Sequence, residues 1–400
     1  MMTAFAFVGQ AVTAVTPTQI NPAGPPGESS YQLAVDQGFT GTLAQWLASI
    51  VGAKGDKGEQ GIQGIAGAKG DPGIQGVPGT KGDVGPTGPG PTPQGRLTLT
   101  SGVPLLTSTV SAAGTVYYTP LSGQLALVGN GLATAPTPVA FAEVSQALSD
   151  TSKSPSAAAA ANVYDLFAWL DGSTFRVTRG PAWSAGATAG SNVLRGAGAG
   201  STALTRVGGV LVNAVDITNG PAAGFGVYVS TILTDAGGAT VSVNFGSGAS
   251  GGGAARIGIW NAFNRETAPL AVRDTATSWT YSGTAVRAAD NSANNSITVV
   301  SGLGTEGLTG AYTQRITGSS SGGGFGGVSV GLDTTTASYN GVYYLIRGPS
   351  AFFDGTVSAP FALNPGSGLH TLYALEQSDG TNANAFAGNG QQQLTGSWRW

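Results

Sequence analysis

Most of the chain alternates between apolar and polar residues in short runs, which is the pattern of half-buried β-strands. From Arg96 onward these runs are separated by Gly, Pro and Asn turns. No fixed period relates the runs, so neither a propeller nor a solenoid is indicated. We expect two β-sandwich-like units, residues 96–250 and 254–400, with the Gly-rich stretch 247–254 as a linker or exposed loop.

Three stretches of this β region are ambiguous. Residues 157–170, AAAAANVYDLFAWL, could form a helix, but their alternating apolar spacing favours a loop followed by the strand VYDLFAWL. Residues 224–246 predict two strands with a turn at 235–238. The Gly-rich segment 318–327 has no Lys and no helix after it, so it does not match a phosphate-binding loop, and we expect a mobile loop there.

Residues 28–51 carry a helical pattern instead. Two Ser/Thr–x–x–Gln sequences have the spacing of a capping box, so short helices should begin near Ser30 and Leu43. Gly38 should end the first helix. The segment has more large apolar side chains than so small a unit can bury alone. These are Tyr31, Leu33, Val35, Phe39, Leu43, Trp46, Leu47 and Ile50. Packing of three copies would bury them, so we expect a trimerisation segment.

Gly occupies every third position from Gly52 to Gly88, in a stretch that extends to Gly90. A strict Gly-X-Y period is what a collagen triple helix requires, because only Gly fits at the crowded axis where three chains meet. A flexible linker would favour Gly and Ser without such a period. We therefore expect a homotrimer with a collagen-like stalk over residues 52–90, about 115 Å long at about 3 Å per residue.

The charged residues of the stalk follow a second pattern, in which a cation at a Y position precedes an anion at the next X position. Such groups can pair between staggered chains, and each exposed pair contributes roughly 0–1 kcal/mol. The pairs are Lys54 with Asp56, Lys57 with Glu59, Lys69 with Asp71, and Lys81 with Asp83. The stretch has few prolines, so we expect flanking domains to hold the three chains in register.

Composition narrows the possible chemistry. The chain has no Cys, a single His and only 9% charged residues, against about a quarter in ordinary globular proteins. Disulfides, thiolate chemistry and clustered Cys or His metal sites are therefore excluded within one chain, and we expect no cofactor. The net charge of −3 argues against nucleic-acid binding. No apolar stretch reaches about 18 residues, so we expect no membrane insertion.

The segment Glu28–Gly52 and the triplets after it resemble a module of tailed-bacteriophage fibre proteins. There, a sequence close to SAYELAV-x-x-GF-x-GT-x-x-x-WLASL-x-G precedes a collagen-like stalk. The matching residues are Tyr31, Leu33, Ala34, Val35, Gly38, Phe39, Gly41, Thr42, Trp46, Leu47, Ala48 and Ser49. Leu43 and Gln45 depart from it, since that family often has acidic residues there. The resemblance implies a trimeric virion fibre, on tail or head, assembled in the bacterial host.

Residues 1–27 begin with an apolar stretch and end in the Pro- and Gly-rich NPAGPPG. A secretory signal carries a basic segment before its apolar core, and this stretch has none, so we favour an ordered arm over a signal peptide. We expect an extended anchor that docks on other virion proteins.

Residues 163–302 resemble a β-rich part that is shared by many phage virion proteins. The matching positions are Tyr164, Asp165, Trp260, Asn261, Asn264, Arg265, Trp279, Tyr281 and Arg287. This second resemblance implies a structural role in the virion and no particular chemistry.

His370, Glu376 and Asp379 come closest to a catalytic set, since a hydrolase needs a carboxylate pair or a nucleophile–base pair in a cleft. The surrounding sequence GLHTLYALEQSDG predicts one strand and a turn, with His370 and Glu376 on one face. We interpret these residues as part of a polar face or an edge strand. We expect no enzyme activity, and no metal site from three copies of His370.

Aromatic residues gather in the C-terminal part of the chain. Sugars stack on such rings, and buried rings also build sandwich cores, which we expect for most of them. Trp398 and Trp400 alternate around Arg399, as on a strand with one buried face. We prefer inter-chain packing for this pair over ligand contact. Together with Trp279 and Tyr281, they are the candidate receptor or tip contacts.

These observations predict a mainly β, homotrimeric phage fibre with an N-terminal anchor, a two-helix clamp and a collagen-like stalk. Its distal β domains would attach to the host surface, with a glycan as the expected receptor and three weak sites reinforcing each other. One alternative is a head fibre or capsid-decorating structural protein. A second is a polysaccharide-degrading tailspike, which would need a clefted carboxylate set. A bacterial collagen-like adhesin is less favoured, because we find no secretion signal or wall anchor.

Overall fold

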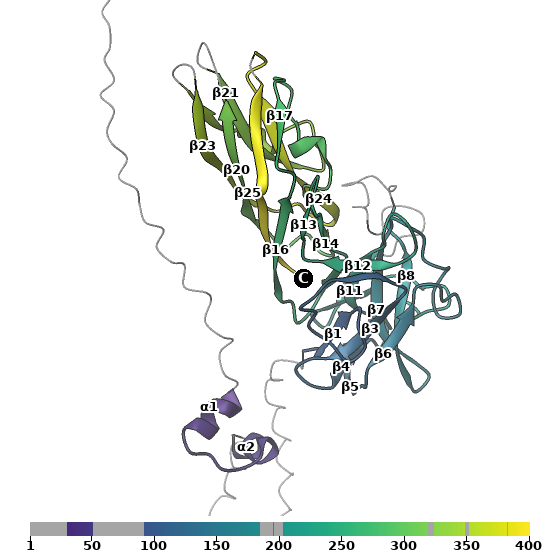
Figure 1. Cartoon of the computed structure of the whole chain (residues 1–400). Coiled ribbons are helices and arrows are strands. Elements are labelled where there is room, and N and C mark those ends of the chain that lie inside the picture. Colours follow the sequence, from purple (N-terminus) through teal and green to yellow (C-terminus); the bar gives the residue numbers. More distant parts are fainter. Residues whose placement is uncertain are drawn as a thin grey trace, which may run out of the picture. The chain divides into compact units, whose positions relative to one another are not determined.

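The computed structural model describes residues 30–50, 92–184, 195, 203–318, 324–348, 352–381 and 383–400 (Figure 1). The chain divides into two compact units, residues 1–83 and 84–400. The expected anchor, the Gly-X-Y stalk and the expected stalk ion pairs lie outside the described residues; those residues are Lys54, Asp56, Lys57, Glu59, Lys69, Asp71, Lys81 and Asp83. The prediction of a mainly β chain is confirmed.

The first unit contains the two expected helices, α1 (Ser30–Asp36) and α2 (Leu43–Ser49). Thr42 caps α2 by a capping box: the Gln45 N–H donates to Thr42 Oγ1 at 3.3 Å, and the Thr42 N–H donates to Gln45 Oε1 at 2.6 Å. Gly38 follows α1 with φ +99°, a left-handed conformation that glycine adopts without strain. Both predicted helix starts are confirmed.

A small aromatic cluster holds this helix pair together. The Tyr31 ring lies 6.4 Å from Phe39 and 6.0 Å from Trp46 between ring centroids, and its hydroxyl donates to the Gly41 carbonyl at 2.9 Å. Four aliphatic side chains stay outside this cluster. Their exposed fractions are 56% for Leu33, 50% for Leu43, 49% for Leu47 and 60% for Ile50. A single copy therefore leaves most of its aliphatic surface in water, as the sequence suggested.

The second unit is built almost entirely of strands. In chain order they are β1 (Gly95–Thr98), β2 (Val110–Ala113), β3 (Thr115–Pro120), β4 (Leu125–Val128), β5 (Thr137–Ala140), β6 (Val144–Ala147), β7 (Val163–Asp171), β8 (Thr174–Ala182), β9 (Leu204–Val207), β10 (Val210–Asn213), β11 (Val227–Leu233), β12 (Val241–Asn244), β13 (Gly248–Ala249), β14 (Ala255–Ile257), β15 (Ile259–Asn261), β16 (Thr267–Asp274), β17 (Ser278–Tyr281), β18 (Arg287–Ala288), β19 (Ser296–Ser301), β20 (Leu308–Gly318), β21 (Phe325–Leu332), β22 (Tyr344–Arg347), β23 (Phe353–Leu363), β24 (Gly368–Ser378) and β25 (Asn384–Arg399). Among the described residues, two 3₁₀ turns interrupt them, η1 (Ala289–Asn291) and η2 (Tyr339–Gly341).

Three of the sheets belong mainly to the first half of this unit. Their strand orders are β1-β3-β6, β4-β5, and β8-β7-β11-β10-β9 with β15 also paired to β11. The predicted strand VYDLFAWL is confirmed as β7. The predicted turn at 235–238 is confirmed as well, since the Gly238 N–H donates to the Asp235 carbonyl. The two strands flanking this turn, β11 and β12, go to different sheets.

Two larger sheets pack face to face in the rest of the unit (Figure 1). Their orders are β2-β12-β14-β19-β24-β21-β22 and β13-β16-β25-β20-β23, with β18 added at β24 and β17 at β25. Glycines set the spacing between the sheets: a Cβ on Gly396 of β25 would lie 2.8 Å from the Ile297 side chain of β19. On Gly326 of β21 it would lie 2.6 Å from Ile316 of β20. The close approach of the two layers depends on these small residues.

The expected linker at 247–254 is partly strand. Gly248 and Ala249 form β13, which runs parallel to β16, and Gly252 and Gly253 are buried. Ser247 donates its N–H to the Gly253 carbonyl, so the stretch folds back on itself instead of extending. Strands from both sides of it share a sheet, since β12 pairs with β14. The division into domains 96–250 and 254–400 stays a prediction.

Close packing at Gly310 on β20 gives a test of this architecture. A Cβ there would collide with the main-chain carbonyl oxygen of Thr395 on β25, and backbone cannot move aside cheaply. Gly310→Ala should therefore lower the free energy of unfolding by about 1–3 kcal/mol, the usual effect of overpacking. At Gly307, just before the same strand, the nearest atom would lie at an ordinary 3.6 Å.

Gly307→Ala is therefore the matched control and should leave stability nearly unchanged. Thermal unfolding followed by circular dichroism measures both variants. Equal melting temperatures for the two would contradict the described contact between β20 and β25.

Candidate functional site

The last strand carries two of the candidate contact residues. At the end of β25 and just after it, Trp398 and Trp400 are buried and Arg399 between them is exposed, so the predicted alternation is confirmed. Trp398 is 0% exposed within the core of its own chain. In this conformation it therefore offers no surface to a receptor or to another copy. Trp400 is 3% exposed and borders a pocket.

Arg96, which lies near the start of this unit in the sequence, contacts Trp400 and fixes its position. Its guanidinium lies over the Trp400 ring, 4.4 Å from the centroid, and Nη1 donates to the carbonyls of Trp400 at 2.9 Å and Asn264 at 2.5 Å. Glu266 and Trp400 exchange two main-chain hydrogen bonds, of 3.1 and 2.9 Å. Burial lowers the pKa of Arg96 to about 10, although Glu266 acts to raise it. The charge of Arg96 is therefore held mainly by an aromatic face and carbonyl oxygens.

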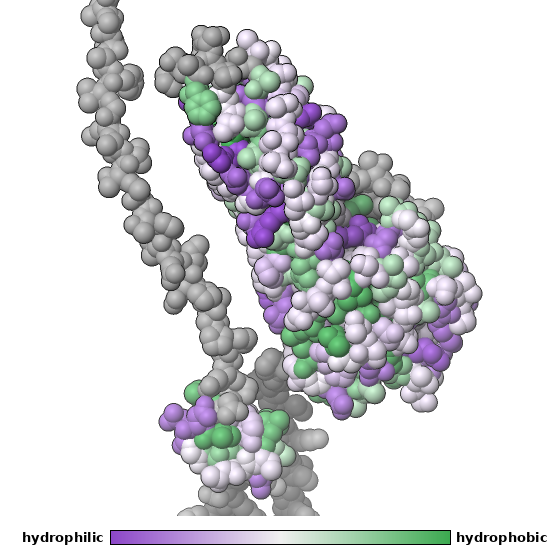
Figure 2. Space-filling model, in the orientation of Figure 1, coloured by the Kyte–Doolittle hydropathy of each residue, from purple (hydrophilic) through white to green (hydrophobic). Residues whose placement is uncertain are grey.

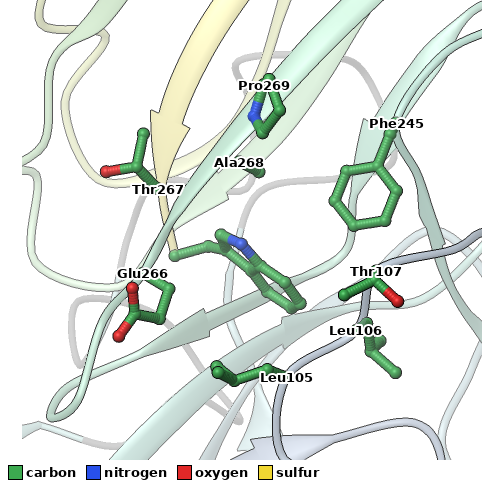
Figure 3. Close-up of a pocket in the computed structure, with 9 residues that line it drawn as sticks. Leu105, Leu106, Thr107, Phe245, Glu266, Thr267, Ala268 and Pro269 are labelled. Carbon is green, nitrogen blue, oxygen red and sulfur yellow. The ribbon is translucent and has the colours of Figure 1, made fainter. Parts of the chain in front are cut away.

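The pocket beside Trp400 has a volume of about 440 Å³, which lies within the range of small-molecule sites. It is lined by three loop residues, by Glu266 and the first residues of β16 after it, and by two aromatic rings: Leu105, Leu106, Thr107, Glu266, Thr267, Ala268, Pro269, Phe245 and Trp400. Figure 3 shows Leu105 and Leu106 on one side of this space, with Ala268 and Pro269 on the other.

The polar groups of this lining are few. They are the exposed Glu266 carboxylate and the hydroxyls of Thr107 and Thr267, set among apolar walls. Figure 2 shows an apolar area on the same unit, over the region where Figure 1 labels β1 and β11. An apolar pocket with one anionic hydrogen-bond acceptor suits a ligand that has both C–H faces and hydroxyl or ammonium groups.

The other two candidate contacts, Trp279 and Tyr281, lie on β17 and are half-buried. Trp279 stacks on Phe386 at 6.2 Å, with an angle of 7° between the rings, and its Nε1 donates to Glu376 Oε2 at 2.6 Å. Tyr281 lies under Arg287, 3.9 Å from its guanidinium, and donates its hydroxyl to the Ala285 carbonyl at 2.7 Å. Both rings are thus committed to contacts within the chain.

Glu376 is fully buried between the two large sheets, where Arg287 Nη2 pairs with it at 2.7 Å. Burial raises the pKa of Glu376 to about 7, although the hydrogen bond from Trp279 and the charge of Arg287 act to lower it. Asp379 lies in the following turn and accepts the Thr381 N–H at 2.8 Å. The structure therefore does not bring Glu376 and Asp379 together in an open cleft.

His370 lies on β24, and its Nδ1 is 2.8 Å from Asp333 Oδ2. The predicted strand and turn are confirmed, but the edge-strand interpretation is wrong because β24 runs between β19 and β21. Within the described ranges, no group of three or more His, Cys, Asp or Glu side chains is placed to hold a metal ion. No described helix is long and apolar enough to cross a membrane.

Asn261 and Asn264, two matching positions of the second resemblance, have structural contacts. The Asn261 side chain accepts from the Leu97 N–H at 2.7 Å and donates to the Leu97 carbonyl at 3.3 Å. Asn264 Nδ2 donates to the carbonyls of Pro93 and Gly95, both at 2.9 Å. Both asparagines thus replace strand partners for the segment that enters the unit. These main-chain contacts give both asparagines a structural role that needs no ligand.

The sequence alone did not indicate Arg96, Glu266 or Phe245 as site residues. Arg96 gave one usable signal, a lone cation opening the strand RLTLT. Glu266 and Phe245 gave none, because nothing local to either residue places it beside Trp400. The pocket arises only when segments far apart in the sequence meet.

Comparison with known proteins adds little. No protein-family model matches the sequence, and no curated protein matches it. A Cry1Da tryptic core variant from Bacillus thuringiensis is 11% identical, with 73% of this chain and 50% of that chain covered and a TM-score of 0.13. An exo-β-1,3-galactanase from Phanerochaete chrysosporium is 13% identical, with 73% and 56% covered and a TM-score of 0.12. This chain thus covers about half the length of either structure, and scores this low support no argument.

The raised pKa of Glu376 predicts a pH dependence of stability. Its pKa rises from an ordinary 4.5 to about 7, so the folded chain holds this proton more tightly than the unfolded chain. The resulting stabilisation is complete below about pH 4.5 and is lost as pH rises through about 7, on the order of 3 kcal/mol in all. Glu376→Gln should remove this part of the slope.

Melting temperatures measured from pH 4.5 to 8 test this for the wild type, for Glu376→Gln and for Asp216→Asn, an exposed carboxylate control. We expect the control to keep the wild-type slope. A slope that persists unchanged in Glu376→Gln would show that another group titrates.

Proposed function

We propose that this chain is a homotrimeric virion fibre of a tailed bacteriophage. In this proposal residues 28–51 align three chains, residues 52–90 form a collagen-like stalk, and the β unit contacts the host surface. The observation that carries the proposal is an unburied apolar stripe on α2, which stands immediately before a strict Gly-X-Y repeat.

The stripe consists of Leu43, Trp46, Leu47 and Ile50, whose i, i+3, i+4, i+7 spacing puts them on one helix face. Half or more of Leu43 and Ile50, and nearly half of Leu47, lies in water in one chain. Fully burying such a side chain contributes about 1.5–3 kcal/mol, and a three-fold assembly repeats each contribution. A triple-helical stalk with few prolines needs a contact of this kind at its start, which holds the three chains in register.

We assign host contact to the pocket beside Trp400. Its apolar walls fit the C–H face of a sugar, and Glu266 can accept hydrogen bonds from hydroxyl or ammonium groups. The same carboxylate would repel acidic sugars, so a neutral or amino sugar is the favoured ligand. One such site would be weak, and three on one fibre reinforce each other through effective concentration.

Localisation on particles tests the biological assignment. Immunogold labelling of intact particles with an antibody to residues 92–400 should place this chain at the tail or baseplate. Label spread over the capsid would instead make it a head fibre or decorating protein. Particles that carry no label would contradict the proposal.

Changes in the α2 stripe should weaken the stalk. Leu47→Ser removes an apolar side chain from the stripe, so the triple-helical circular-dichroism signal should melt at a lower temperature than in the wild type. Ala48→Ser, on the opposite face of α2, is the matched control and should melt like the wild type. Identical melting of the two variants, or no triple-helical signal in any of them, would contradict a clamp role for α2.

The pocket assignment predicts the effect of Glu266→Gln on sugar binding. Loss of one charged hydrogen-bond partner is worth about 1.5–3 kcal/mol, so affinity for neutral and amino monosaccharides should fall about tenfold or more. Titrations of the full chain, followed by saturation-transfer NMR, measure this against Glu143→Gln, whose carboxylate lies elsewhere and accepts bonds from Ser101 and Thr119. Equal affinities for both variants would remove the pocket from the proposal.

A further inference from the structure

One side of the face-to-face sheets has two open strand edges. Among the described strands, β22 pairs only with β21 and β23 pairs only with β20, so each ends its sheet. The two lie against each other: a Cβ on Gly355 of β23 would lie 2.5 Å from Ile346 of β22. Both sheets therefore end on the same side of the unit, with unpaired main-chain groups along it.

Apolar side chains are exposed along this side. The exposed fractions are 48% for Val342, 38% for Tyr343 and 38% for Leu345, on the segment that runs from η2 into β22. We call these three residues the edge patch. Natural proteins usually protect an open edge with charges, prolines or a covering segment, because unpaired strands associate with other chains. On this side β23 carries Asp354 and Pro360, whereas the segment that leads into β22 exposes the apolar edge patch. An apolar patch at such an edge is typical of a surface that is covered in the assembled protein.

A hollow lies next to the patch, between η2, β22 and β23. Its volume is about 140 Å³, and its walls include Tyr339, Val342, Tyr344, Pro360 and Phe361. Pockets for small-molecule ligands usually measure about 300–1,000 Å³, so this hollow is too small for most of them. It is large enough for one apolar side chain of a protein partner.

We propose that the edge patch and this hollow form the contact between copies of the β unit, and that the occupant is a second copy of this chain. This inference rests on the three-chain fibre proposed above. A strict Gly-X-Y repeat works only with three chains wound together, so two further β units would be tethered beside the first. Tethering raises their effective concentration into a range where a modest apolar contact is occupied.

The geometry of a three-fold ring fits two unlike surfaces. In a closed ring of three, each contact is heterologous, so one surface of a copy meets a different surface of the next. The edge patch is exposed and the hollow is recessed, and they adjoin at Val342, which belongs to both. A patch side chain of one copy can therefore fill the hollow of its neighbour.

The contact would leave the Trp400 pocket free. In the sheet order β13-β16-β25-β20-β23, the pocket residues of β16 and the edge strand β23 lie near opposite ends. Copies that meet along β22 and β23 therefore turn their pockets away from each other. One side of the unit serves assembly, and the other stays open to the host.

Single cysteines test this surface, because the natural chain contains none. We would make Tyr343→Cys and Leu345→Cys in the edge patch, and Ser278→Cys as a control. Ser278 is exposed and lies on β17, which pairs with β25 on the side away from β20. Each full-length variant is sized by light scattering, labelled with a maleimide and treated with a flexible bismaleimide.

We expect all three variants to have the mass of three chains. The patch cysteines should react about tenfold or more slowly than Cys at position 278, and only they should give cross-linked pairs. Trimers in which all three positions react equally fast without cross-linking would overturn this surface and leave the fibre proposal intact. A single-chain mass for the wild type would overturn both. Because two patch positions are tested, the result does not depend on one variant that fails to fold.

Discussion

The contact between Arg96 and Trp400 closes the β unit. It joins β1 to Trp400, the residue that follows the last strand, β25, and both side chains are buried. Within the described contacts, Arg96 Nε and Nη2 have no hydrogen-bond partner, so the cation depends on the indole face and on two carbonyl oxygens. Burying a charge this way is costly unless every contact is kept. The fold keeps these contacts because Arg96 is fixed within β1 while its partner Trp400 is fixed by two main-chain hydrogen bonds to Glu266.

Neighbouring contacts support this closure, and the pocket is built on it. Asn261 and Asn264 hold the incoming segment by its main chain, so its position does not rely on Arg96 alone. Trp400, whose ring lies against the Arg96 guanidinium, forms part of the pocket that we assign to host contact. In the proposed fibre, force on the β unit would pass through this segment to the stalk. Fixing the segment at the start of the β unit is therefore consistent with a fibre that holds this unit away from the particle.

The sequence predicted local structure well, because local structure has local causes. The Thr42 capping box begins α2 and Gly38 ends α1, and alternating apolar residues determine strands such as β7 and β24. Alternation of apolar and polar residues identifies a strand, but it does not identify the partner strands in the sheet. It therefore could not indicate that β11 and β12 separate into different sheets, or that Glu376 lies between two layers. The Trp400 pocket was beyond prediction for the same reason, since its walls come from residues 105, 245 and 266 as well as 400.

The central claim is that three of these chains form one fibre. Electron microscopy of the purified full-length protein tests it most directly. The account predicts a thin rod of about 115 Å for the stalk, with a three-fold head of β units at one end and a small knob at the other. Isolated single β units, with no rod and no three-fold symmetry, would contradict it.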